Sequence, residues 1–138
     1  MSHPAAKPDR LGITGFRRGA SYTILYAARS RAVNAAVAWY GQIKMPHTPG
    51  VRTVSPLEVS GKITASFLGL YGDADAVIPA ADVRGMEAVM KAVNRTAEFV
   101  LYPGAPHALY ADYRPTSYHA DAAKDAWNRC LEWFKKYL

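Results

Sequence analysis

Cysteine is almost absent from the sequence, because Cys130 is the single one among 138 residues. A lone cysteine excludes an internal disulfide, and no cysteines and histidines cluster at the short spacing that a zinc site requires. We therefore expect no bound metal and no cofactor. The cysteine usage favours a reducing compartment.

Long hydrophobic runs are also missing. No apolar run reaches the roughly 18 residues of a membrane span, and residues 1–10, MSHPAAKPDR, contain no apolar core of the kind that a signal peptide has. Half of the residues are hydrophobic, which suits one domain with one core. We expect a soluble cytoplasmic protein with a single domain over residues 1–138, in which 1–10 form an exposed lead-in, and no membrane partner.

The positive charge is not gathered into a stripe. The formal net charge is +6, and the dense basic spots are scattered pairs: Arg17 with Arg18, Arg29 with Arg31, and Lys135 with Lys136. A nucleic-acid interface combines such residues with exposed aromatics in one patch. A basic composition alone indicates solubility and non-specific attraction, so we expect no nucleic-acid partner.

Four apolar runs predict buried strands. They lie at residues 11–16, 34–41, 63–71 and 97–102, and their continuous hydrophobicity is typical of strands in a parallel sheet. Between the second and third runs, the stretch 42–61 contains several prolines and little periodicity. It predicts a long surface loop with one short helical turn near Pro56.

Helical spacing appears between and after these runs. Residues 20–28 predict a first helix, and a second helix, capped by Asp82, has Glu87 and Lys91 spaced to pair on its wet face. Alternating strands and helices of these lengths predict an α/β fold, a parallel sheet of about four strands with helices on both faces.

The last helix is expected from about Tyr118 to the end, with His119 packing or capping at its start. Its apolar stripe is predicted to contain Ala123, Trp127, Cys130, Leu131, Phe134 and Leu138. This stripe would bury Cys130 against the sheet, far from the strand ends.

The first strand leads into a glycine-bracketed turn, Gly15-Phe16-Arg17-Arg18-Gly19. A strand, a sharp turn and a helix in the pattern Gly-x-nucleophile-x-Gly form a nucleophile elbow, whose central side chain projects above the sheet. Here the central residue is Arg17, and a guanidinium stays protonated and cannot attack a carbonyl. Arg17 is either an inert substitution or an anion-binding arginine at a helix amino terminus.

Candidate site residues follow the strand ends, where parallel sheets bind their ligands. These are Arg17, Tyr40, His107 and either Asp73 or Asp75. An acid after one strand and a histidine after the next repeat the hydrolase order of nucleophile, acid and histidine. Such a carboxylate orients an imidazole and stabilises its protonated form, while the imidazole takes the proton of a nucleophile.

Several segments resemble the carboxyl-terminal half of the dienelactone hydrolase family, an α/β-hydrolase family. They are GFRRG, AVAWYG, LYGDADAVIP, YPGAPHA, YH at 118–119 and AKDAW at 123–127, and the resemblance covers nearly all of the chain. It implies that Asp75 is the acid, that His107 is the base and that Arg17 stands in the place of a nucleophilic cysteine. Ala20, directly after Gly19, stands where the family usually has a second glycine.

The resemblance implies hydrolysis of a small-molecule lactone or carboxylic ester through an acyl-enzyme, with Tyr40 in the substrate pocket. Arg17 would impair this reaction. The backbone amide of Arg18 would supply one oxyanion donor, while the second donor belongs to an amino-terminal half that has no counterpart among the ten or so residues before the elbow strand. We therefore expect a single truncated α/β-hydrolase-like domain, half of the fold.

That truncation would leave the strand 11–16 as a sheet edge, with apolar side chains on both faces and unpaired amides. We expect a homo-oligomer or a partner chain to cover it. Two alternatives to the enzyme remain: a non-catalytic homologue that acts by assembly or binding, and a fragment of a longer protein or one half of a split or oligomeric assembly.

Overall fold

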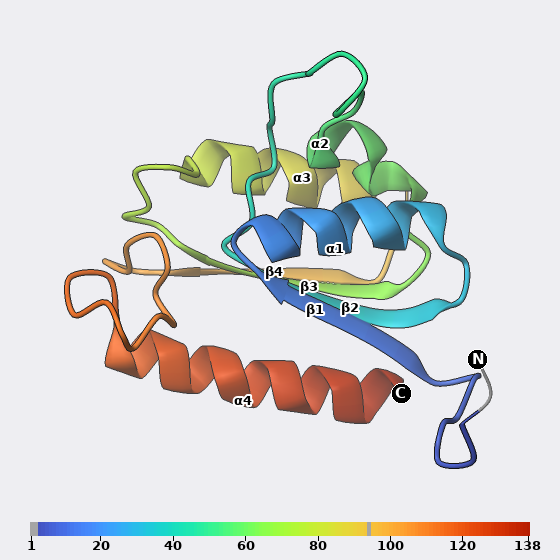
Figure 1. Ribbon diagram of the computed structural model, residues 1–138. Coiled ribbons are helices and arrows are strands. Elements are labelled where there is room, and N and C mark those ends of the chain that lie inside the picture. The colour runs from blue at the N-terminus through green and yellow to red at the C-terminus, as the bar shows by residue number, and fades with distance from the viewer. Residues whose placement is uncertain (1–2, 94) are drawn as a thin grey trace.

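The chain folds around a four-stranded sheet with helices on both faces, in a computed structural model that describes residues 3–93 and 95–138 (Figure 1). The elements are β1 (Leu11–Phe16), α1 (Arg18–Arg29), β2 (Val33–Trp39), α2 (Pro56–Val59), the 3-10 helix η1 (Ser60–Lys62), β3 (Ser66–Gly72), α3 (Ala80–Ala92), β4 (Ala97–Tyr102) and α4 (Ala120–Tyr137). All three strand pairs are parallel, in the order β1-β2-β3-β4. The predicted α/β architecture is confirmed.

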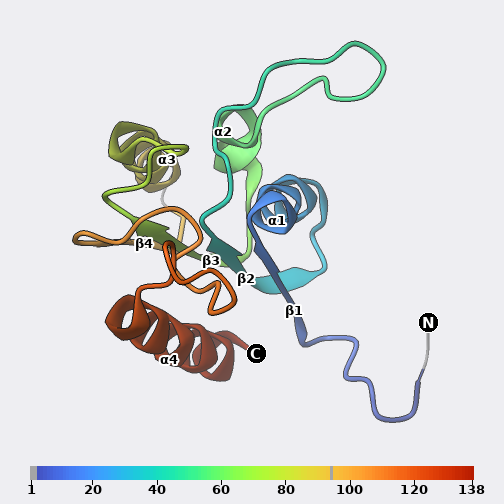
Figure 2. The ribbon, with the colours of Figure 1, turned by 60° about the vertical axis from the view of Figure 1, so that its left-hand side comes forward.

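Three helices cover one face of the sheet, and one covers the other. Helices α1, α2 and α3 lie above the sheet and α4 lies alone below it (Figure 1), as the turned view also shows (Figure 2). The two central strands, β2 and β3, are buried on both faces at nearly all of their positions, and the helices and loops packed against them complete the core. None of the helices within residues 3–93 and 95–138 is long and apolar enough to cross a membrane.

The third strand begins later than its apolar run. The run over 63–71 predicted a strand from Ile63, but β3 begins at Ser66. Ile63 has no exposed surface and follows η1 directly, so it belongs to the core without pairing in the sheet. An apolar run alone does not distinguish a strand from the buried segment that leads into it.

The predicted cap of α3 is wrong. The helix begins at Ala80 after Pro79, whose φ of −58° already suits a helical start. Asp82 therefore lies within the first turn, where its carboxylate forms an ion pair with Lys44 Nζ at 2.7 Å. The predicted pair on the wet face is confirmed, because Lys91 Nζ lies 2.8 Å from Glu87 Oε1.

Helix α4 faces the sheet with part of the predicted stripe: Ala123 and Cys130 are buried, and Phe134 and Leu138 pack partly buried against the core. Trp127 and Leu131 are 41% and 48% exposed, and the buried residues are Ala122, Ala123, Ala126, Cys130 and Trp133. Small alanines allow close approach to the sheet, and Trp133 Nε1 donates a hydrogen bond to the Ser66 carbonyl at 3.1 Å. Cys130 lies in the core, and His119 caps the helix by accepting from the Ala122 amide, both as expected.

Strand β1 is the edge of the sheet, as expected. It pairs with β2 on one side only, within the described part of the chain. Its two ends carry Leu11 and Phe16, which are 40% and 38% exposed. Residues 3–10, which precede it, are exposed, while Met1 and Ser2 of the expected lead-in lie outside the described residues.

Candidate active site

The turn after β1 has the backbone of an elbow. Arg17, between β1 and α1, has φ 54° and ψ −120°, a backbone conformation that residues other than glycine rarely adopt and that costs about 1–3 kcal/mol. Its amide donates to the Trp39 carbonyl at 2.9 Å, which ties the turn to the end of β2. A Cβ on Gly15 would lie 2.4 Å from the carbonyl of Gly19, so the close approach of strand and helix requires glycine at position 15.

Helix α1 presents its amino terminus at this turn. Arg18 is its first residue, so the Arg18 amide has no acceptor within the helix, and no side chain caps the end. Amides at such a terminus can stabilise a developing negative charge. The position fits the oxyanion donor predicted for Arg18.

The structure brings Asp75 and His107 together. Asp75 follows β3 and His107 follows β4, and these loops lie at the same end of the sheet as the turn after β1 (Figure 1). Asp75 Oδ2 lies 2.7 Å from His107 Nδ1, and Asp75 Oδ1 accepts from the amides of Val77 at 2.7 Å and Ile78 at 2.9 Å. The Asp75 side chain has no exposed surface.

Hydrogen bonding keeps the Asp75 carboxylate ionised. Burial alone would raise its pKa, but the bonds from His107, Ile78 and Val77 outweigh burial and lower the pKa below its ordinary value. A carboxylate only accepts hydrogen bonds, so Nδ1 of His107 carries a proton and donates it to Asp75. In the neutral ring, Nε2 is then left as the basic nitrogen.

Asp73, the other candidate acid, has a different partner. Its Oδ1 accepts from the Gly104 amide at 2.7 Å, and its own amide donates to the Tyr102 carbonyl at 3.0 Å. It therefore connects the loop after β3 to the loop after β4. A Cβ on Gly72 would lie 2.0 Å from the Ala105 carbonyl, which shows how closely these two loops pack.

A cleft of about 490 Å³ opens at this end of the sheet. Its lining residues are Arg17, Arg18, Tyr40, Gln42, Val77 and His107. Four of the predicted site residues thus share one cleft, and Asp75 supports His107 as its hydrogen-bond partner. The sequence interpretation missed Gln42 and Val77, which lie further along the loops that follow β2 and β3; the position directly after a strand, which was the signal used for the others, does not single them out.

Tyr40 both lines the cleft and packs in the core. It is 3% exposed, and its ring meets that of His107 edge-on at 5.7 Å. Burial and, to a smaller extent, Tyr113 raise the pKa of Tyr40 to about 12, against the opposing effect of the Arg17 charge. The phenol is therefore neutral at physiological pH and can donate a hydrogen bond.

No metal centre emerges from these groups. Across residues 3–93 and 95–138, no three His, Cys, Asp or Glu side chains are placed to hold a metal ion. The chemistry that the cleft itself offers is proton transfer at His107, together with positive charge from Arg17, Arg18 and the helix terminus.

Curated relatives match almost the whole chain. A protein of Methylorubrum extorquens named "Putative carboxymethylenebutenolidase" is 46% identical over 132 residues, which are 96% of this chain and 45% of the relative. A protein of the same name from Escherichia coli K12 is 47% identical, over 93% of this chain and 46% of the relative. The chain thus spans about half the length of the curated relatives that it matches.

Solved structures agree with this relationship. A crystal structure titled as a "Putative Dienelactone Hydrolase" from Klebsiella pneumoniae superimposes with a TM-score of 0.90 at 44% identity. The match covers 97% of this chain and 55% of the Klebsiella chain. An acylaminoacyl peptidase of Pyrococcus horikoshii has a TM-score of 0.81 at 18% identity, which shows a shared fold only. The fold is therefore about half of an α/β-hydrolase domain, and, since the model of the dienelactone hydrolase family matches residues 1–138, the chain belongs to that family.

Proposed function

We propose that this chain carries the acid–base part of a site that hydrolyses lactones or carboxylic esters, and that the arginine at position 17 impairs the reaction. The observation that carries the proposal is the 2.7 Å contact between the buried Asp75 carboxylate and His107, whose ring lines the same cleft as the elbow. Buried carboxylate–imidazole pairs of this kind orient a general base.

The arrangement assigns a role to each group. With a nucleophile at position 17, His107 Nε2 would accept its proton, and Asp75 would stabilise the imidazolium that forms. The Arg18 amide would donate to the oxyanion of the tetrahedral intermediate. Arg17 itself supplies no nucleophile, because its guanidinium has no lone pair available for attack at any usable pH.

The proposed substrates are small-molecule lactones or esters. The relatives are named carboxymethylenebutenolidases, and a protein of Bradyrhizobium that is 34% identical is named a "Probable 2-oxo-3-(5-oxofuran-2-ylidene)propanoate lactonase". The cleft of about 490 Å³ has the size of a small-molecule site.

The test is to install the missing nucleophile. The protein, Arg17→Cys and Arg17→Ala are assayed against 4-nitrophenyl acetate and a dienelactone. We expect hydrolysis to increase in Arg17→Cys alone, because His107 can activate a thiol, and we expect Arg17→Cys/His107→Ala to lose about 10²–10⁴ of that rate. A folded Arg17→Cys variant that is no faster than Arg17→Ala would contradict the proposal.

One observation favours a second candidate, a non-catalytic homologue that binds an anion. Arg17 and Arg18 both line the cleft, and neither forms an ion pair within residues 3–93 and 95–138. Their charges and the amino terminus of α1 would all favour a carboxylate or phosphate there. Acetate or phosphate binding that Arg17→Ala abolishes, together with an inactive Arg17→Cys, would support binding over hydrolysis.

A further inference from the structure

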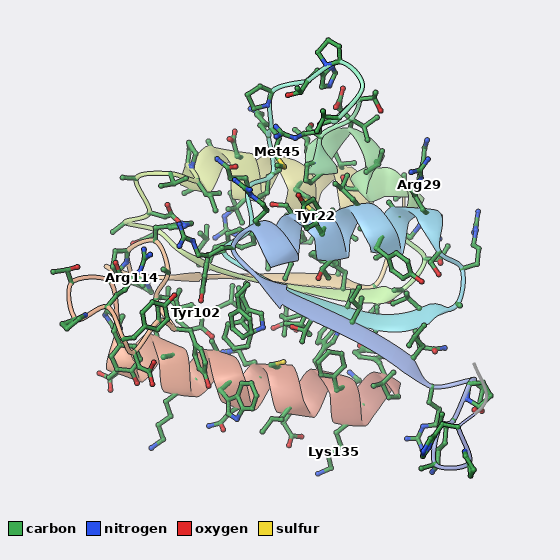
Figure 3. The ribbon with its side chains drawn as sticks, viewed as in Figure 1. Tyr22, Arg29, Met45, Tyr102, Arg114 and Lys135 are labelled. Atoms are coloured by element: carbon green, nitrogen blue, oxygen red, sulfur yellow. The ribbon has the colours of Figure 1, made fainter. Side chains whose placement is uncertain are left out.

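A second cleft, of about 340 Å³, lies on the face of the sheet that α1, α2 and α3 cover, and His107 is not among its lining residues. Its walls come from α1, from the connection between β2 and α2, and from α2 with η1. None of its lining residues belongs to the cleft of the candidate active site. Figure 3 shows Tyr22 and Met45, two of its lining residues, on the α1 side of the molecule.

The cleft has apolar walls that the fold leaves partly open to solvent. These walls are made by Tyr22, Leu25, Met45, Val51, Val54 and Val59. Tyr22 is 58% exposed and Val51 is 82% exposed, although the chain has a well-filled core elsewhere. Apolar side chains that gather around a concave surface of this size are typical of sites for small molecules.

Backbone hydrogen bonds hold the outer wall in place. The amides and carbonyls of Thr48 and Arg52 pair in both directions at 2.7 Å, which closes the loop between them. Arg52 Nη1 also donates to the Pro46 carbonyl at 2.7 Å. The cleft is therefore formed by a loop whose own contacts fix its shape.

All the charged residues that line this cleft are basic. They are Arg29, Arg52 and Lys62. Neither Arg29 nor Lys62 forms an ion pair in the described part of the chain, and the acid of α2, Glu58, is bound to His47 at 2.9 Å. A cation in the last turn of α1 also suits the helix dipole, which accounts for Arg29 but not for Arg52 or Lys62.

We propose that this cleft binds an amphipathic anion, a carboxylate carried on an apolar body. The apolar walls would take the body, and the three cations would take the carboxylate, since opposite charges attract most strongly where solvent is partly excluded. This binding site is separate from the cleft of the proposed hydrolytic function, and the proposal does not depend on that function.

Calorimetric titration with octanoate and with 3-phenylpropionate tests the proposal, since the first carries its carboxylate on an aliphatic body and the second on an aromatic one. We expect saturable one-site binding with a Kd below about 1 mM. Affinity should fall about tenfold in Arg29→Gln/Lys62→Gln, because two exposed charge contacts are lost. It should fall also in Tyr22→Ser, which removes apolar wall from an exposed position.

The matched control is Lys135→Gln/Lys136→Gln, which removes the same net charge from α4, on the opposite face of the sheet (Figure 3). We expect this variant to bind as the unaltered protein does. Equal loss in both double variants, equal binding of 1-octanol, or no saturation by either carboxylate would overturn the proposal. The assay of Arg17→Cys is independent of all these outcomes.

Discussion

The side chain at position 17 is an arginine, so the acid–base pair of Asp75 and His107 has no nucleophile to activate there. The backbone of Arg17 keeps the strained conformation of an elbow, with φ 54° and ψ −120°. Residues held in such regions persist where the surrounding structure enforces them. Here Gly15, the start of α1 and the bond to Trp39 enforce it, so the conformation belongs to the turn and does not depend on a nucleophile.

Asp75 makes the clearest prediction for a single residue. Its pKa is lowered in the fold, so its ionised form stabilises the protein above the ordinary carboxyl pKa near 4, and this contribution is lost as pH falls through the lower folded-state value. Asp75→Asn should cost about 1–3 kcal/mol of unfolding free energy at pH 7, because a buried hydrogen-bond network is broken. Urea unfolding measured between pH 7 and pH 3 should show less loss of stability with acid in the variant.

Asp73→Asn is the matched control for that measurement. Asp73 is exposed, and its one side-chain bond, from the Gly104 amide, can be accepted equally by an asparagine oxygen. We expect a change within about 0.5 kcal/mol. An equal cost in both variants would show that the hydrogen bonds of Asp75 contribute no more stability than the single bond of Asp73.

In Arg17→Cys, adding Asp75→Asn should also favour the wrong tautomer of His107 and slow hydrolysis.

At the scale of elements, the junction of β1 and α1 depends on one glycine and not on its neighbour. A Cβ at Gly15 would meet the Gly19 carbonyl at 2.4 Å and Thr23 Oγ1 at 2.8 Å, whereas a Cβ at Gly19 would meet nothing within 4 Å. Strand and helix can therefore approach this closely only with glycine at position 15.

This contrast predicts opposite effects of the same substitution. Gly15→Ala should destabilise the protein by about 1–3 kcal/mol, because helix and strand must separate. Gly19→Ala should be neutral or stabilise by up to about 1 kcal/mol, because alanine favours the helix. Thermal unfolding of both variants measures the difference, and a Gly15→Ala variant as stable as Gly19→Ala would contradict the close approach seen here.

For the molecule as a whole, the unpaired edge of β1 is the feature that predicts association with another strand. The edge strand is six residues long, with Leu11 and Phe16 partly exposed at its ends. Exposed edges with apolar side chains pair readily with other strands. Whatever occupies this edge would also lie beside the elbow, since Phe16 immediately precedes Arg17.

We expect this chain to associate with a second copy through β1. Sedimentation at micromolar concentration should give a species heavier than the monomer, and Leu11→Lys should weaken the association, because a charged edge residue opposes strand pairing. Leu131→Lys, at a 48% exposed position on α4, is the control and should associate normally. A clean monomer in the unaltered protein would count against self-association and leave a different partner chain as the candidate for this edge.

Local patterns in the sequence determined the order of elements, the elbow and the residues that follow each strand. These depend on short stretches, since apolar runs, glycine spacing and helical periodicity act within a few residues. Position after a strand offered both Asp73 and Asp75, and the family resemblance indicated Asp75. Only the tertiary structure shows that Asp75 contacts His107 while Asp73 accepts from the Gly104 amide. Only the tertiary structure shows that Trp133, and not Leu131, packs inward from α4. It alone also shows that α1 and the loop 48–54 line a second cleft. These outcomes arise from strand register and helix packing between distant segments, which no local pattern encodes.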